Sequence, residues 1–204
     1  ARQRQQLREA KRMLAAESLG VVLANRNGPE QGVLSGTREA VAAAAESCRR
    51  RGFAATPLPV GGAFHSPLMQ DARKRFVQAL KKIRVTPGPV PVYSNATGAR
   101  YPDDARLARR RLGDHLLQPV DFVRELETLQ AEGIETFLEV GPRAVLTGLA
   151  GRVLQNRPVN LLAVDASSGR APGLLDLARA LCRLAALGFP VRIGEWESPV
   201  APAD

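Results

Sequence analysis

The sequence predicts an α/β fold, because short runs of β-favouring residues alternate with longer segments of helical periodicity. Glycine and proline separate most of these segments and mark the expected turns. The chain has 204 residues, of which 45% are hydrophobic. It is therefore long and apolar enough to bury a core, either as one large domain or as two small ones.

The first part of the chain, residues 1–62, predicts the order helix, strand, strand, helix, strand. This order resembles a partial ferredoxin-like βαββαβ unit that lacks its first strand. Because that strand lies inside the sheet in this topology, either an upstream segment completes the sheet or the assignment is wrong. The expected elements are a helix at 3–18, strands at 21–24 and 31–35 around a turn at 25–29, a helix from 35–37 that Gly52 ends, and a strand at 53–60.

The alternation continues in two further parts, residues 63–157 and residues 158–204. The last part gives one strand, a loop and a helix, followed by a tail that is typical of a linker packed back on a domain. The expected helices are 66–83, 103–117, 120–131, one from Ala144 and 174–187; the expected strands are 90–94, 136–140 and 160–164; turns or loops are expected at 95–98 and 165–173.

The charge of the chain favours acidic partners. Lysine and arginine total 29 against 20 acidic residues, which gives a net charge of +9. Nucleic acid, the phosphates of a CoA nucleotide or an acidic protein would each be attracted. Only 4% of the residues are aromatic, and none lies among the arginine runs at 49–51 and 109–111. Stacking on bases is thus poorly supported, and we expect no nucleic-acid partner.

The sequence indicates a cytoplasmic protein. No apolar run is as long as a membrane span, and the polar residues 1–6 do not form a secretory signal. Cys48 and Cys182 lie far apart in expected helices, with neither metal-ligand spacing nor a disulfide framework. We expect two buried thiols, no metal site and no membrane association.

One stretch carries a candidate catalytic residue. Residues 60–69 read Val-Gly-Gly-Ala-Phe-His-Ser-Pro-Leu-Met, in which Ser66 can cap and Pro67 can open a helix. His65 is then placed at a helix N-terminus, where partial positive charge disfavours the imidazolium and leaves a neutral ring that can act as a general base. The alternative is a histidine that only fills the corner between a strand and a helix.

Five motifs occur in a familiar order and spacing. They are Ala-Asn-Arg-Asn-Gly-Pro at 24–29, Phe-His-Ser-Pro-Leu-Met at 64–69, Tyr-Ser-Asn at 93–95, Leu-Gln-Pro-Val at 117–120 and Glu-Val-Gly-Pro at 139–142. With them the chain resembles the C-terminal part of a malonyl-CoA:acyl carrier protein transacylase, specifically the acyltransferase domain of a polyketide synthase. This resemblance implies that residues 63–157 form the C-terminal part of an α/β-hydrolase-like acyltransferase subdomain.

The resemblance also implies a ping-pong acyl transfer. A serine in a G-x-S-x-G elbow attacks the thioester of malonyl-CoA, and the acyl group then moves to the phosphopantetheine thiol of an acyl carrier protein. His65 stands at the position of the family's catalytic histidine, and the backbone carbonyl of Gln118 is expected to orient its ring. No bound cofactor is implied beyond the CoA thioester and the carrier's phosphopantetheine.

By the same resemblance, three residues before His65 line the acyl pocket. Ala63 and Phe64 favour malonyl over methylmalonyl, since a smaller side chain than Phe accompanies methylmalonyl. Gly62 stands where malonyl-type members usually carry histidine, so selectivity is expected to be looser. His115 matches no motif position and is expected on a helix surface.

The chain contains no G-x-S-x-G motif, and Ser35 and Ser168, the two serines followed by glycine, lack a strand-elbow-helix context. We therefore expect the nucleophile in an N-terminal portion of the same acyltransferase, as a partner of this chain, and expect the chain alone to be inactive. The alternative is a non-catalytic carrier-protein docking or scaffold module, which needs no nucleophile.

Overall fold

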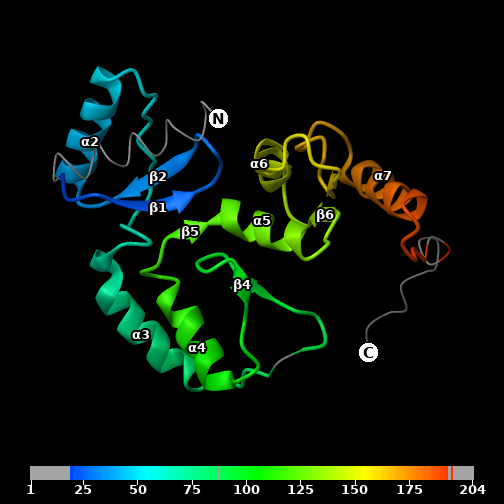
Figure 1. Ribbon diagram of the computed structural model, residues 1–204, viewed down its shortest axis with the longest axis horizontal. Coiled ribbons are helices and arrows are strands. Elements are labelled where there is room, and N and C mark those ends of the chain that lie inside the picture. The colour runs from blue at the N-terminus through cyan, green and yellow to red at the C-terminus, as the bar shows by residue number, and fades with distance from the viewer. Residues whose placement is uncertain (1–18, 87, 193, 195–204) are drawn as a thin grey trace. The chain divides into compact units, whose positions relative to one another are not determined.

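The structure is a computed structural model that describes residues 19–86, 88–192 and 194 (Figure 1). The helix expected at 3–18 and most of the expected tail lie outside the described residues. The chain divides into two compact units, Ala1–Gly133 with Arg152–Leu154, and Ile134–Gly151 with Gln155–Asp204. The three-part division expected after residues 62 and 157 remains a prediction.

The first unit contains a three-stranded sheet in the order β2-β1-β5. Strand β1 (Val22–Arg26) runs antiparallel to β2 (Gly32–Ser35) and parallel to β5 (Val120–Asp121). Both expected strands are confirmed, but the expected turn at 25–29 begins too early, because the last two residues of β1 pair with β5. That partner is almost a hundred positions away along the chain, beyond the reach of local turn signals.

Helix α2 (Arg38–Arg50) covers the β1–β2 hairpin (Figure 1). The Thr37 hydroxyl caps it by accepting a hydrogen bond from the Ala40 N–H at 3.2 Å. Ala44 and Cys48, which lie four residues apart and so share one face of the helix, are buried on its inner side. The residues packed against them are Leu19, Val21, Leu34, Phe53 and Ala55.

The strand expected at 53–60 is wrong, because this segment forms no ladder in the described part of the chain. Phe53 and Ala55 still pack on the α2 core, so the alternation of apolar residues is real. In a ferredoxin-like sheet this strand would pair with the first strand, for which the described residues offer no candidate. The segment therefore packs its apolar side chains against α2 but has no neighbouring strand to pair with within the described ranges.

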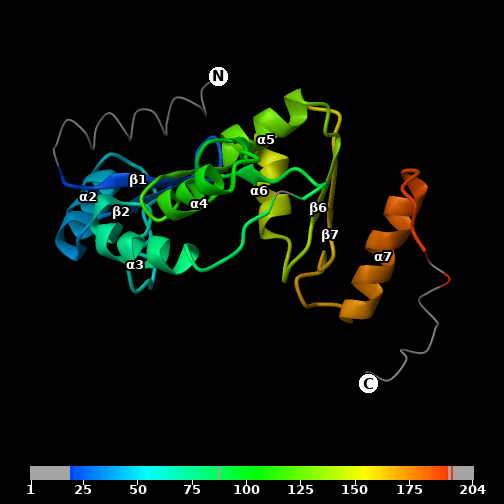
Figure 2. The same ribbon diagram turned by 90° about the horizontal axis from the view of Figure 1, so that it is seen from below.

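After the histidine stretch, one 3₁₀ turn (Pro67–Met69) leads into α3 (Gln70–Leu80), which packs beside α4 (Ala105–Asp114) (Figure 2). The expected helix at 66–83 is confirmed except at its end. It stops at Leu80, which leaves Ile83 exposed rather than in the core. A Cβ on Gly113 of α4 would lie 2.5 Å from Val77 Cγ2, so the absence of a side chain there permits the close approach of the two helices.

A short hairpin and one more helix complete the first unit. Strand β3 (Tyr93–Ser94) pairs with β4 (Ala99–Arg100) around the turn expected at 95–98, and Gly98 closes it with a φ of 62°. Helix α5 (Phe122–Ala131) directly follows β5 and buries Val123 and Leu126. The helices and the turn expected for this region are therefore confirmed.

The second unit is a small α/β unit. Strands β6 (Thr136–Glu139) and β7 (Asn160–Ala163) pair in parallel, with helix α6 (Val145–Val153) between them in sequence and α7 (Gly173–Ala186) following. These four elements confirm the expected ones. One expectation about α7 is wrong, because Cys182 is exposed, whereas Cys48 in the first unit is buried.

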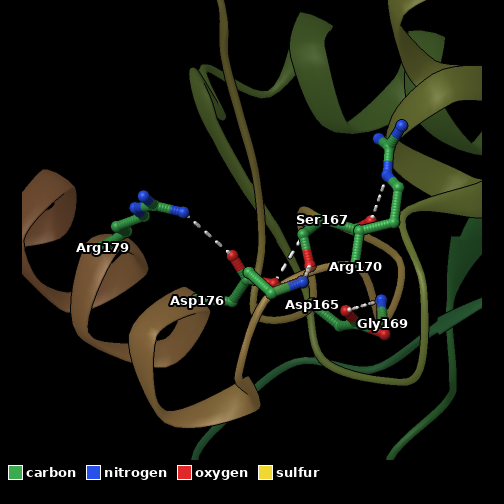
Figure 3. Close-up of polar contacts among 7 residues, drawn as sticks. Asp165, Ser167, Gly169, Arg170, Asp176 and Arg179 are labelled. Atoms are coloured by element: carbon green, nitrogen blue, oxygen red, sulfur yellow. Dashed lines mark hydrogen bonds and ion pairs between the residues drawn. The ribbon is translucent and has the colours of Figure 1, made fainter.

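The loop between β7 and α7 is held by its own polar groups (Figure 3). The Asp165 carboxylate accepts a hydrogen bond from the Gly169 N–H at 2.9 Å, and that of Asp176 accepts one from the Ser167 N–H at 3.1 Å. Asp176 is 1% exposed, and the hydrogen bond from Ser167 lowers the pKa of its carboxyl. Ser168 lies in this exposed loop, without the strand-elbow-helix context of a nucleophile.

No helix in the described ranges is both long enough and apolar enough to cross a membrane.

Candidate active site

The backbone of His65 has an unusual conformation. Its φ of 59° lies in the left-handed region, which costs about 1–3 kcal/mol for a residue with a side chain. The His65 N–H donates a hydrogen bond to the Leu116 carbonyl at 3.0 Å, which helps to hold this conformation. Such strain persists only where the surroundings fix it, and it is concentrated at functional sites.

Ser66 fixes the chain on the other side of His65. Its hydroxyl donates to the Ala63 carbonyl at 2.6 Å and accepts from the Leu68 N–H at 3.3 Å, and the residue is only 1% exposed. Pro67 occupies the first turn, where a missing N–H costs nothing. The predicted serine cap and proline start are confirmed, and they place His65 just before a helix.

The imidazole of His65 is held by two main-chain carbonyls. Its Nδ1 lies 2.8 Å from the carbonyl oxygen of His115 and 3.0 Å from that of Gln118. Because a carbonyl oxygen can only accept, this geometry assigns the proton to Nδ1 and leaves the lone pair on Nε2. The ring is thereby fixed in the tautomer whose outer nitrogen can take up a proton.

Both carbonyls lie just beyond the end of α4, whose last residue is Asp114. The final carbonyls of a helix have no partners within the helix and carry partial negative charge. Both contacts are made to Nδ1, so these carbonyls orient the imidazole ring. Arg73 of α3 forms an ion pair with Asp114, which ties the helix after His65 to the helix whose end holds its ring.

The His115 carbonyl is the contact that the sequence analysis missed. Only Gln118 was expected to orient His65, yet the His115 oxygen lies closer to Nδ1. The motif at 117–120 pointed to Gln118, whose carbonyl oxygen does contact the ring, but it gave no indication of His115 three residues earlier. The sequence could have indicated this second contact, because the end of a helix offers several main-chain carbonyls that have no partner within the helix.

The expectation that His115 lies on a helix surface is wrong. Its Nε2 lies 2.8 Å from the Ser94 hydroxyl and 3.0 Å from the Tyr101 hydroxyl, and the ring is partly buried. Burial lowers the pKa of His115, and electrostatic repulsion from the His65 ring and from the Arg111 guanidinium lowers it further, against an opposing effect of Asp114. The reason is long-range packing of the β3–β4 hairpin against the end of α4.

The three residues before His65 differ in exposure. Phe64 is 47% exposed, whereas Ala63 and Gly62 are partly buried. A Cβ on Gly62 would lie 3.4 Å from Cε2 of the Phe64 ring. The ring therefore rests against backbone that carries no side chain, and it is the largest apolar group next to the histidine.

Two of the remaining motifs have structural partners. Arg26 forms an ion pair with Asp121 at 3.2 Å, between β1 and β5. Glu139 accepts hydrogen bonds from the Thr147 N–H at 2.7 Å, the Thr147 hydroxyl at 2.6 Å and the Leu146 N–H at 3.0 Å, so it caps the start of α6. Burial acts to raise the pKa of Glu139, but these hydrogen bonds outweigh it and lower the pKa.

No group of three or more His, Cys, Asp or Glu side chains that could hold a metal ion occurs within residues 19–86 and 88–192.

An α/β chain with a histidine held by main-chain carbonyls is typical of enzymes that pair a histidine base with a nucleophile. Comparison with known families identifies the particular class. Residues 2–170 match the acyl transferase domain, and the chain belongs to this family.

The similar proteins include a malonyl CoA-acyl carrier protein transacylase and the acyltransferase domain of a polyketide synthase. The malonyl CoA-acyl carrier protein transacylase of Bacillus subtilis is 38% identical over 146 residues, which are 71% of this chain and 45% of that protein. The crystal structure of the acyltransferase domain from the second module of the salinomycin polyketide synthase aligns with a TM-score of 0.80 and 31% identity, covering 94% of this chain and 44% of that one.

A second similar structure is that of a type II polyketide synthase acyl-carrier protein in complex with its malonyl-transacylase. It aligns with a TM-score of 0.70 and 30% identity, covering 84% of this chain and 53% of the solved one. The chain thus spans about half the length of each of these three proteins.

Proposed function

We propose that this chain supplies the histidine half of an acyltransferase site that moves a malonyl group from CoA to the phosphopantetheine thiol of an acyl carrier protein in polyketide biosynthesis. The observation that carries the proposal is the double carbonyl contact of His65 Nδ1, which leaves Nε2 as a base. Family membership supplies the reaction class.

The proposed mechanism has two halves. A serine hydroxyl attacks the malonyl thioester carbonyl while Nε2 of His65 takes the serine proton, and the imidazolium returns that proton to the departing CoA sulfur. The carrier thiol then attacks the malonyl-serine ester, giving its proton to Nε2, which passes it to the serine oxygen. The carbonyls of His115 and Gln118 stabilise the imidazolium in both halves.

The serine is proposed to lie in a portion of the same acyltransferase outside these 204 residues, because no G-x-S-x-G motif occurs in them. The chain covers 45% of the Bacillus subtilis relative, which leaves ample length for such a portion. This chain alone is then inactive. No metal takes part, and the CoA thioester and the carrier's phosphopantetheine are substrates rather than resident cofactors.

The finer fold assignment belongs to the same proposal. The β1–β2 hairpin with α2 is taken as part of a ferredoxin-like subdomain, and the elements from His65 to residue 157 as the C-terminal part of an α/β-hydrolase-like acyltransferase subdomain. The antiparallel β1–β2 pair and the parallel β6–β7 pair fit these two descriptions respectively.

Selectivity for malonyl is proposed to depend on Phe64. Its exposed ring is large enough to occupy the space that an α-methyl group of methylmalonyl would need. Ala63 and Gly62 leave the ring room to move, because neither carries a side chain larger than a methyl group. Since one methyl group is worth about 1–3 kcal/mol, selectivity from this contact is moderate.

The carrier protein and CoA are proposed as partners on grounds of chemistry and likeness. The net charge of +9 suits the phosphates of CoA and an acidic carrier surface. One similar solved structure is a malonyl-transacylase bound to its carrier protein.

Transfer of a labelled malonyl group tests the proposal. This chain is combined with a serine-bearing N-terminal portion from a family relative, and label is followed from malonyl-CoA to a carrier protein. We expect His65→Ala to lower the transfer rate by a factor of roughly 10²–10⁴, the range for loss of a general base.

The control is Ser168→Ala, which removes an exposed hydroxyl from the β7–α7 loop and is expected to transfer label at the unchanged rate. Transfer by His65→Ala as fast as by the unaltered chain would show that the base lies elsewhere. Carrier binding without any transfer would instead favour a non-catalytic docking module.

A further inference from the structure

The side chain of His115 is not used by the mechanism above, yet it is firmly held. Its Nε2 faces two hydroxyls, from Ser94 at 2.8 Å and from Tyr101 at 3.0 Å. Ser94 is 0% exposed, and the rings of Tyr101 and His115 have centroids 5.9 Å apart. A buried imidazole needs such partners, but these two also determine where the residue as a whole can lie.

The main chain of the same residue contacts the base. The His115 carbonyl oxygen lies 2.8 Å from His65 Nδ1, the shorter of the two carbonyl contacts. Helix α4 ends at Asp114, and His115 keeps helical torsion angles, with φ −56° and ψ −28°. The N–H groups of Leu117 and Gln118 donate to the Asp114 carbonyl and hold the backbone of this turn. The anchored ring adds a side-chain constraint on the residue whose carbonyl contacts the base.

We propose that His115 is a positioning residue for the reaction: its imidazole, held by the Ser94 and Tyr101 hydroxyls, sets the direction of the main-chain carbonyl that orients His65. This inference rests on the proposed function of His65 as the base. The three residues form a link from the β3–β4 hairpin to the base. The role acts through His65 and requires no contact between His115 and the substrate.

Burial supports this arrangement, because it keeps the His115 ring neutral and able to accept from a hydroxyl. Tyr101 is held in turn, with the Arg111 guanidinium 5.9 Å from the centre of its ring. Each member of the link is therefore fixed by another group in the first unit. A displacement of the carbonyl by about 1 Å would be costly, since misplacement of that size lowers catalytic rates by up to ~100-fold.

The first test reads the His65 ring without any substrate. The chain contains two histidines, so ¹⁵N-histidine labelling gives a simple spectrum. We expect a protected, downfield Nδ1–H signal from His65 in the unaltered chain. His115→Ala keeps the main-chain carbonyl but loses the anchored ring, and it should broaden or abolish that signal, whereas His115→Gln, whose amide can reach the same hydroxyls, should retain it.

The second test measures kinetics with the serine-bearing portion added. We expect His115→Ala to lower kcat by roughly tenfold with the KM for malonyl-CoA changed by less than about twofold, and His115→Gln to recover most of the loss. An unaltered His65 signal together with an unaltered kcat in folded His115→Ala would overturn the proposal.

Tyr101→Phe provides a second variant in case His115→Ala does not fold. It removes one hydroxyl that contacts His115 but retains the packing of the aromatic ring. We expect a weaker His65 Nδ1–H signal and a kcat lowered by about two- to threefold, while Ser168→Ala, an exposed serine, changes neither. A normal signal and kcat in Tyr101→Phe and in Ser94→Ala would contradict the link. If neither the unaltered chain nor any variant transfers label, while the His65 Nδ1–H signal changes as expected, the proposed function is wrong. The positioning of His65 by His115 would still be supported in that case.

Discussion

The Nδ1 atom of His65 lies 2.8 Å from the main-chain carbonyl oxygen of His115, at the end of helix α4. In the proposed mechanism, this main-chain carbonyl takes the place that a carboxylate has in a full catalytic triad. The two acceptors differ in what a mutation can remove, because substitution changes side chains and retains carbonyls. Mutational evidence about this site has to be interpreted with that distinction in mind.

Gln118→Ala is expected to leave transfer within about threefold of the unaltered rate, because the Gln118 side chain is exposed and the contact to His65 Nδ1 at 3.0 Å uses its carbonyl oxygen. The measurement is kcat/KM for malonyl-CoA in the complemented enzyme. A loss above tenfold would mean that the side chain itself contacts substrate or partner.

Gly62→His is expected to raise the preference for malonyl over methylmalonyl. A Cβ there would lie 3.4 Å from the Phe64 ring, so a side chain would restrict the ring and with it the room for an α-methyl group. The expected change in the ratio of kcat/KM values is between about 10- and 200-fold, the range for one methyl group in an apolar pocket.

The matched control for that change is Gly61→His, since a Cβ on Gly61 would meet nothing within 4 Å. Competition between malonyl-CoA and methylmalonyl-CoA for one carrier protein provides the ratio directly. Equal effects of the two substitutions on this ratio would show that the Phe64 ring does not determine selectivity.

The stability of the chain is expected to fall as the pH drops below about 6.5, the pKa of an unperturbed histidine. Burial lowers the pKa of His115 in the fold, with His65 and Arg111 acting in the same direction and Asp114 opposing them. The unfolded chain therefore binds more protons in this range, so unfolding becomes easier towards acid pH. Above that range His115 is neutral in both the folded and the unfolded chain, and its contribution to the free energy of unfolding is fully present.

Urea unfolding at a series of pH values between about 5.5 and 7.5 measures this slope, since most carboxyl groups titrate below that window. His115→Gln should flatten the slope, because glutamine does not titrate. An identical slope in both proteins would show that the His115 ring is as free to protonate in the fold as in the unfolded chain.

Gly113→Ala is expected to destabilise the chain by about 1–3 kcal/mol, although alanine normally favours a helix. The new Cβ would lie 2.5 Å from Val77 Cγ2 and push α4 away from α3. Gly148→Ala in α6 is the control, since its Cβ would meet nothing within 4 Å, and it should stabilise by up to about 1 kcal/mol. Thermal unfolding of the two variants compares them, and a stabilised Gly113→Ala would contradict the packing described for α3 and α4.

Local sequence signals were sufficient to predict most helices and the serine cap beside His65. The Thr37 and Ser66 caps, the Gly98 turn and the stripe of Ala44 and Cys48 all depend on neighbours within a few residues. Such signals are complete in a short window of sequence. The class of protein followed from five motifs in order, a longer pattern of the same kind.

Features that depend on distant partners were harder to predict. The extension of β1 through Arg26 depends on its pairing with β5. The prediction of a strand at 53–60 was wrong because that segment has no neighbouring strand to pair with in the part of the chain that the structure describes. His115 was misplaced for the same reason, because Ser94 and Tyr101 reach it from a hairpin that precedes α4. Hydrogen bonding between segments is set by topology, which periodicity along one segment does not encode.

The left-handed backbone of His65 has a consequence for mutational robustness. Its N–H and ring are anchored to residues 115–118, whereas the residues proposed to face an acyl group are the preceding residues 62–64. Side chains there can therefore be diversified in a library without moving the base. Evolution of a new acyl preference and preservation of proton transfer are, at this corner, separable problems.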